Sequence, residues 1–218
     1  MPTLLPMLLL PVMLLTGLVL DSPALAADPE SPHPHQLISP VVSKPAALDL
    51  NTDEQAIVDG GGVVVRSQRT KLGGEGQAVQ LVNAPPSAVW DAILGYPLYP
   101  ERVSTVVSAT VYERDGDTFY VDMKSSIMGY ETVLYSRNAL HRDEGWMAWS
   151  LDYRRTSDVK DIAGYWRVEQ IQDSPPLTRL EHSTVLAISG VPGFVVKHLT
   201  RQSLADGVAW VKKAAEGS

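Results

Sequence analysis

The sequence predicts an α+β domain in which helices pack against one face of a curved antiparallel sheet. The middle of the chain, from residue 103 to residue 189, consists of short stretches of alternating apolar and polar residues separated by turns. Such alternation is typical of strands with one buried face, and the short turns indicate antiparallel neighbours. A helical pattern precedes this region at residues 86–95, and a longer one ends the chain at residues 192–215.

The N-terminus has the features of an export signal. Leu4 to Leu20 is almost unbroken apolar sequence, and Ala24 and Ala26 occupy the −3 and −1 positions of an A-x-A cleavage site. Residues 1–26 are therefore predicted to be a signal peptide, which places the mature protein in the periplasm or outside the cell. The alternative is an uncleaved N-terminal membrane anchor, for which the apolar run is at the short limit and is interrupted by Pro11.

Composition excludes several classes of function. The chain has no cysteine, which excludes disulfides, a thiolate metal site and a catalytic thiol. Its formal net charge of −7 argues against nucleic acid as a partner, because binding to phosphates depends on clustered cations. The P-loop, dinucleotide, G-x-S-x-G and H-E-x-x-H motifs are missing from the sequence. We therefore assign no catalytic residue, metal ligand or cofactor, and expect His141, His182 and His198 to be exposed or hydrogen-bonded structural residues.

Residues 27–60 are predicted to be a proline-rich linker or arm that contains one short helix. Proline is frequent and apolar residues are few up to Pro45, which is typical of an extended or disordered segment. His33 and His35 lack a third nearby ligand, so a solvated linker is favoured over a metal site. A helix is expected within residues 48–58, with Asn51 or Thr52 as its N-cap.

The folded domain is expected at residues 61–216, and periodicity and turn residues define its elements. A hairpin comes first, with strands at residues 63–68 and 77–83 around a glycine-rich turn. Pro85 and Pro86 then open the short helix, and Gly95 ends it. Residues 96–100 are expected to form a proline-fixed loop. Further strands are expected at residues 103–113, 118–127, 131–140, 146–153, 162–171 and 179–189.

Alternation also predicts which side chains face inward. The inward set on three of the strands is Phe119, Val121, Met123, Met147, Trp149, Leu151 and Trp166. A shift of one residue would instead bury charged side chains, namely Asp122, Lys124, Asp152, Arg167 and Glu169. The facing of residues 131–140 is ambiguous, because the set with Tyr135 and the set with Leu134 are both compatible with the pattern. An outward Arg137 is favoured, because a buried guanidinium without a partner is costly.

The terminal helix has small residues in the middle of its inner face. Leu199, Ser203, Gly207 and Trp210 recur at helical spacing, so two small residues lie between two large ones. Two interpretations are open: a cavity under the helix, or close contact between the helix and the sheet. The cavity interpretation predicts a ligand site lined by the seven inward strand residues together with Leu199, Ser203 and Gly207.

Four segments of the chain resemble one superfamily. They are VNAPPSAVWDAILGYPLYPERV, GYETVLYSRN, GYWRVEQI and the terminal GVPGFVVKHLTRQSLADGVAWVK. In this order they are similar to the START-like polyketide cyclase/dehydrase and coenzyme Q-binding families of the Bet v 1-type (SRPBCC) superfamily, over about residues 62–215. The resemblance implies a helix-grip fold, in which a curved antiparallel sheet wraps around a long C-terminal helix and leaves an apolar cavity. It also implies a hydrophobic ligand such as a lipid, a quinone or a polyketide.

Two functions from different classes follow. The first is an exported binding or carrier protein for a hydrophobic small molecule, with transient membrane contact. The second is a cyclase/dehydrase-like or hydrolytic enzyme that acts on such a molecule in the same cavity. The carrier is favoured because apolar side chains dominate the inward positions. An accessory domain with a filled core and no ligand is a third interpretation.

Overall fold

A computed structural model of the protein describes residues 27–34, 36–127, 130–188 and 193–217, with their side chains except those of residues 127, 130 and 193–203. The predicted signal peptide, its cleavage site and the alternative membrane anchor lie outside these residues. Within the described ranges, no helix is long and apolar enough to cross a bilayer.

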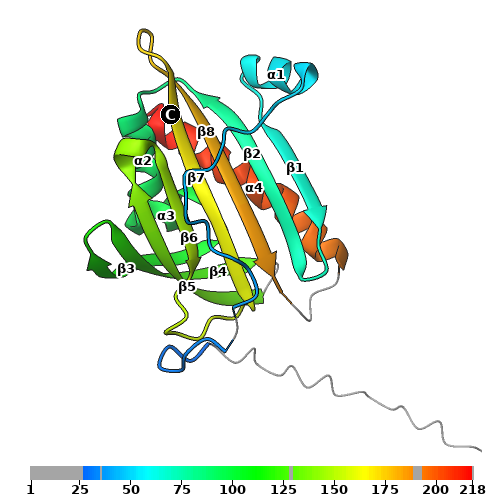
Figure 1. The fold of residues 1–218 in the computed structure, drawn as a ribbon, viewed down its shortest axis with the longest axis vertical. Helices are drawn as coiled ribbons and strands as arrows, with labels where there is room; N and C mark the ends of the chain where they lie inside the picture. The colour runs from blue at the N-terminus through cyan, green and yellow to red at the C-terminus, as the bar shows by residue number, and fades with distance from the viewer. Residues whose placement is uncertain (1–26, 35, 128–129, 189–192, 218) are drawn as a thin grey trace, which may run out of the picture.

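One antiparallel sheet forms the body of the described chain (Figure 1). Its strands are β1 (Val64–Arg69), β2 (Gly73–Val82), β3 (Val106–Asp115), β4 (Thr118–Ile127), β5 (Tyr130–His141), β6 (Trp146–Leu151), β7 (Asp161–Gln172) and β8 (Leu177–Ala187). Their spatial order is β1-β2-β8-β7-β6-β5-β4-β3, so the N-terminal hairpin pairs with the last strand. With the long C-terminal helix, this arrangement confirms the predicted α+β helix-grip fold.

The described α-helices are α1 (Thr52–Asp59), α2 (Pro86–Leu94), α3 (Tyr99–Arg102) and α4 (Gly193–Ala215). Asn51 is the N-cap of α1: its side chain accepts a hydrogen bond from Glu54 N, and the Glu54 side chain accepts one from Asn51 N. Residues 96–100, expected as a loop, instead form a 3-10 turn (Tyr96–Leu98) that leads into α3. The prolines lie in the first turns of these helices, where a missing N–H costs no hydrogen bond.

Helix α4 covers one face of the sheet, which we call the inner face. It contacts β1, β2 and β8 and also packs on α2, and in Figure 1 it passes behind these strands. Leu204, Val208 and Val211 are fully buried in this contact. At Gly76 of β2 an added Cβ atom would lie 2.2 Å from Leu204 Cδ1, so a glycine is needed where the helix approaches the sheet.

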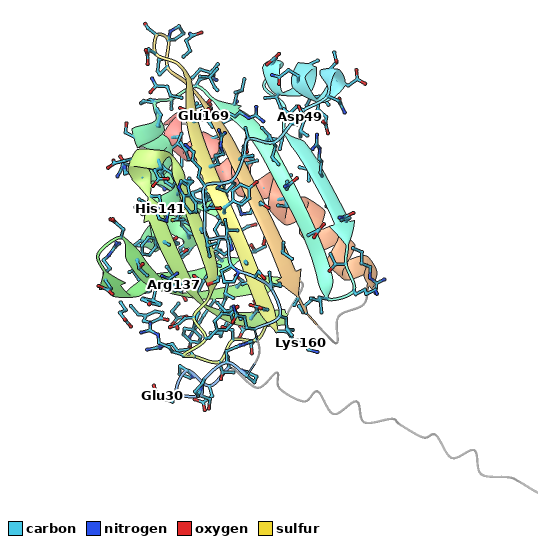
Figure 2. All side chains as sticks on the ribbon, viewed as in Figure 1. Glu30, Asp49, Arg137, His141, Lys160 and Glu169 are labelled. Carbon is cyan, nitrogen blue, oxygen red and sulfur yellow. The ribbon has the colours of Figure 1, made fainter. Side chains whose placement is uncertain are left out.

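The pairing register confirms the predicted facing of the strands. All seven residues expected to face inward lie on the inner face: Phe119, Val121, Met123, Met147, Trp149, Leu151 and Trp166. The register also settles the facing of β5, because Phe119 pairs with Asn138 and Val121 pairs with Ser136. Arg137, between these two partners, is exposed on the opposite, outer face (Figure 2). Its predicted outward orientation is therefore confirmed.

Part of the outer face is covered, although the alternation of the strands predicts a solvated one. Asp152 and Arg167 were expected to be exposed, yet they are only 2% and 7% exposed. Both are paired on the outer face, where Asp152 accepts hydrogen bonds from Tyr112 and Arg154, and Arg167 donates to Glu169. The N-terminal arm, residues 27–34 and 36–50, lies against this face and is not a solvated linker. Strand β6 ends at Leu151, two residues earlier than expected.

Candidate ligand-binding site

Three aromatic rings form a cluster on the inner face of β6, β7 and β8. The rings of Trp149 and His182 are stacked, with centroids 5.1 Å apart and an interplanar angle of 20°. Trp166 lies opposite His182 in the β7–β8 pair, with ring centroids 4.2 Å apart, and its ring is 6.0 Å from that of Trp149. We call Trp149, Trp166 and His182 the ring cluster. Aromatic faces of this kind pack well against planar or extended apolar groups.

Gly164 of β7 allows the ring cluster to form. It pairs with Trp149 of β6, and the indole lies across its backbone. A Cβ atom at this position would be 2.4 Å from Trp149 Cζ2 and 2.1 Å from Ser183 O. Any other residue would push the indole away from the strand, so the glycine determines where the Trp149 ring lies.

The surroundings of His182 favour its neutral form. Burial lowers the pKa of His182 to about 3, because the protonated ring would lose its hydration. Its Nδ1 atom is inaccessible to solvent and has no hydrogen-bond partner among the described residues. A buried polar atom without a partner is uncommon in native proteins and costs about 1–3 kcal/mol. His182 therefore offers an unused hydrogen-bonding atom in apolar surroundings.

Gly207 of α4 faces His182 across a gap. A Cβ atom on Gly207 would lie 3.9 Å from His182 Nδ1 and 4.0 Å from Cε1, and no other described residue has an atom within 4 Å of it. Leu204, three residues earlier, is instead pressed against Gly76. At neighbouring points of the same helix there is therefore no room for a side chain on Gly76, but room for at least a methyl group on Gly207, above His182.

Two inward side chains of the ring cluster keep accessible surface. Trp149 and His182 are partly exposed, whereas Phe119 and Met147 on the same face are each 1% exposed. Because a close-packed core leaves no accessible surface, the packing is incomplete at Trp149 and His182. We call the space between the ring cluster and Gly207 the inner recess.

The inner face near α2 and α3 is filled by aromatic side chains. The ring centroids of Tyr96 and Phe119 are 5.7 Å apart, and those of Tyr99 and Trp210 are 4.8 Å apart. The Tyr99 hydroxyl donates a 2.6 Å hydrogen bond to Ile93 O, so its polar atom is satisfied within the core. This packing limits the inner recess to the end of the sheet that carries the ring cluster.

The predicted cavity residues differ in where they lie. Trp149, Trp166 and Gly207 lie at the inner recess, and Met123 is a partly exposed residue on the inner face of β4. The others whose side chains are described belong to the packed interior, and these are Phe119, Val121, Met147 and Leu151. The side chains of Leu199 and Ser203 lie outside the described part of the chain.

His182 and Gly164 were not among the predicted site residues. His182 was expected to be exposed or hydrogen-bonded, but its Nδ1 atom is buried without a partner among the described residues. The signal for its role is that it lies opposite Trp166, and the sequence predicts that β7 and β8 are neighbours but not the register that pairs these two residues. Gly164 could not be identified either, because a glycine is required there only when the Trp149 indole of the neighbouring strand lies across it.

Charged groups lie away from the ring cluster. Asp152, Asp161 and Glu181 are all buried on the outer face and hydrogen-bonded there. In the described ranges, no group of three His, Asp or Glu residues could hold a metal ion. Two surface hollows of about 370 and 390 Å³ are lined largely by polar and charged residues and include no member of the ring cluster. The inner recess is thus the apolar site of the described structure.

Comparison with protein families shows to which family the chain belongs. The family model described as "Polyketide cyclase / dehydrase and lipid transport" matches residues 82–207, which is more than half of the chain. The protein belongs to this family. The matched region of the polyketide cyclase/dehydrase and lipid transport family includes α2, the ring cluster and Gly207, whereas the arm, α1 and β1 precede it.

Solved structures share the fold of this family at low sequence identity. A protein from Thermus thermophilus has a TM-score of 0.58 and 15% identity, covering 66% of this chain and 97% of that one. An aromatase/cyclase from Streptomyces sp. R1128 has a TM-score of 0.54 and 18% identity, with coverages of 70% and 94%. A STAR-related lipid transfer protein from Xanthomonas axonopodis has a TM-score of 0.53 and 10% identity, with coverages of 72% and 92%. No curated protein matches the sequence.

Proposed function

We propose that this protein binds a hydrophobic small molecule in the inner recess and acts as its carrier. The observation that carries the proposal is the His182 Nδ1 atom, which has no hydrogen-bond partner among the described residues, lies beside two indole rings and faces Gly207, where α4 carries no side chain. A packed core avoids both an unpaired buried nitrogen and an unfilled gap, because each lowers stability. A bound ligand would fill the gap and pair the nitrogen together.

The inner recess favours a ligand with a flat or extended apolar body and one polar atom. The indoles of Trp149 and Trp166 provide the apolar contact. Neutral His182 donates to a carbonyl or accepts from a hydroxyl, according to its tautomer. Lipids, quinones and polyketides all combine these features. The family description, which names both lipid transport and polyketide cyclisation, supports the same class of ligand.

A cyclase/dehydrase-like enzyme is the alternative function, and the family description is the observation that favours it. The chemistry of the inner recess supports the carrier instead. With its pKa lowered to about 3, His182 is a weak general base at neutral pH. The carboxylates of Asp152, Asp161 and Glu181 lie on the outer face, away from the recess. A carrier releases its ligand chemically unchanged, which separates the two functions experimentally.

The proposed place of action is outside the cytoplasm, after removal of residues 1–26. The apolar segment from Leu4 to Leu20 and the A-x-A motif that ends at Ala26 support this assignment. A carrier in an aqueous compartment exchanges a hydrophobic ligand at a membrane surface, so transient membrane contact belongs to the proposal. Removal of residues 1–26 takes away one charged residue, Asp21, and changes the formal net charge from −7 to about −6, which still opposes lasting attachment to anionic lipid.

Native mass spectrometry of the mature protein, purified from its own host, tests the carrier function. We expect an added mass that disappears after extraction with organic solvent, and an extracted apolar compound that rebinds unchanged. The purified protein should also bind cis-parinaric acid or a fluorescent quinone analogue. A protein that carries no added mass and binds neither probe would refute the carrier. Recovery of a chemically altered compound after rebinding would favour the enzyme.

A further inference from the structure

We propose that the N-terminal arm is a strap that positions the ring cluster from the outer face of the sheet and thereby sets the affinity of the inner recess. Figure 1 shows the arm crossing β7 and β8 on the side opposite α4. Figure 2 shows its two ends, at Glu30 and Asp49, near opposite ends of the sheet. The arm precedes the family-matched region at residues 82–207. The affinity part of this inference rests on the proposed function, whereas the positioning part does not.

Asp161, the first residue of β7, anchors the middle of the arm. Its Oδ2 atom accepts hydrogen bonds from Leu37 N at 2.6 Å and Ile38 N at 2.7 Å, and the carboxylate is completely buried. The other oxygen, Oδ1, accepts a 2.8 Å hydrogen bond from the Tyr153 hydroxyl. A buried carboxylate with this many donors holds its backbone partners firmly, since losing them would leave a charge unsatisfied.

Ile38 adds an apolar anchor beside Asp161. It is 9% exposed and packs against Ala163 of β7 and Ala187 of β8, whose small side chains leave room for it. Val42, four residues further along the arm, is 87% exposed and makes no comparable contact. The two residues are thus a matched pair of apolar arm side chains, one docked and one free.

A third anchor lies at the end of the arm near α1. Leu48 N donates to the Glu181 carboxylate at 3.2 Å, and Arg179 returns a 2.5 Å hydrogen bond to Leu48 O. Arg179 Nε also lies 2.7 Å from Glu181 Oε1, so the buried glutamate is paired by both the arm and its own strand. At the opposite end of the arm, His33 N donates to Tyr153 O at 3.0 Å.

Two anchor residues lie next to positions that set the ring cluster along the same strands: Ala163 next to Gly164, and Glu181 next to His182. Ala163, beneath Ile38, precedes Gly164, on which the Trp149 indole rests. Glu181, bonded to Leu48, precedes His182. Because successive side chains of a strand point to opposite faces, a shift of β7 or β8 at an anchor moves the ring next to it. The arm therefore holds β7 and β8 from the outer face, and the inner faces of these strands form the inner recess.

Ile38→Ala, with Val42→Ala as control, tests the strap in the full mature chain. We expect Ile38→Ala to speed amide hydrogen exchange in peptides covering residues 161–172 and 177–187 by at least threefold. It should also increase tryptophan quenching by acrylamide and weaken cis-parinaric acid binding at least threefold. Val42→Ala should match the wild type in all three measurements. If Ile38→Ala fails to fold, Ile38→Val, which removes a single methylene, gives the same comparison at smaller amplitude.

Three outcomes would overturn the strap or the proposed function. Wild-type exchange in β7 and β8 for both Ile38→Ala and Asp161→Ala would overturn the strap. Faster exchange with unchanged probe affinity would overturn it as well, because the arm would then stabilise the strands without affecting the affinity of the inner recess. A wild-type protein that binds no probe refutes the proposed function, and the exchange and quenching data then decide the positioning part alone.

Discussion

Replacing Gly207 by leucine should raise the free energy of unfolding if a recess lies beneath the helix, and lower it if the core there is filled. At this position the Cβ atom would lie 3.9 Å from His182 Nδ1, an ordinary contact, and the rest of the side chain would enter the inner recess. Leucine favours a helix over glycine by about 1 kcal/mol, and burial of its side chain is worth about 1.5–3 kcal/mol. Because the two contributions add, we expect the variant to unfold at higher urea concentration, with a gain of about 2.5–4 kcal/mol.

The same substitution should abolish ligand binding, because the leucine occupies the space that the ligand needs. Urea unfolding followed by tryptophan fluorescence measures the first effect, and titration with cis-parinaric acid measures the second. Ala209→Leu is the matched control, since Ala209 is exposed on the same helix. It should leave probe affinity unchanged and alter stability by less than about 0.5 kcal/mol.

Two results would refute the reasoning. In a filled core, an added leucine causes overpacking and costs about 1–3 kcal/mol, so a clear loss of stability would show that no recess exists. A stable Gly207→Leu protein that still binds the probe with wild-type affinity would place the ligand somewhere else. Gly207→Ala should fall between wild type and Gly207→Leu in both measurements.

Three further predictions concern Gly164, His182 and the N-terminus. Gly164→Ala should destabilise the protein by more than about 2 kcal/mol in urea unfolding, because its Cβ atom would overlap Trp149 and Ser183 O; a change below about 0.5 kcal/mol would contradict the indole position. His182 has a pKa of about 3 when folded and about 6.5 when unfolded, so the unfolded chain binds more protons between these values and stability falls as the pH drops through this window. His182→Phe should flatten that decline, as measured by urea midpoints from pH 7 to pH 4, and an unchanged slope would argue against a buried neutral imidazole. N-terminal sequencing of the exported protein should begin at Ala27, whereas an intact N-terminus in the membrane fraction would support the anchor.

The register of the sheet could be predicted where large apolar residues alternate with charged ones. In β4 a slip of one residue would exchange Phe119 and Val121 for Tyr120 and Asp122, so only one facing is favourable. In β8 the same argument fails around His182, because its neighbour Glu181 is also polar. Alternation therefore does not show which of the two side chains faces inward. The facing of His182 depends on Trp166, its partner in the adjacent strand.

The docking of the arm could not be predicted for a different reason. Its central contacts with Asp161 come from the backbone N–H groups of Leu37 and Ile38, which every residue except proline possesses. A proline-rich stretch with few apolar residues has the composition of a solvated linker whether or not such contacts form. The two carboxylates that receive the arm, Asp161 and Glu181, are 123 to 133 residues away in the sequence, so no local pattern marks them as its partners.

The pairing of β2 with β8 has a consequence for how this protein reaches its folded state. Each residue of β2 from Gly73 to Val82 finds its partner between Thr178 and Ala187, so the sheet stays divided until almost the whole chain is available. Contacts of such long sequence separation slow folding, because a large loop must close before they form. Until then the N-terminal hairpin presents an unpaired strand edge, which is a template for wrong association. We expect newly made chains to spend longer in partly folded, aggregation-prone states than a helical protein of the same size. We also expect a chaperone to improve their folding until β8 has been synthesised and can pair with β2.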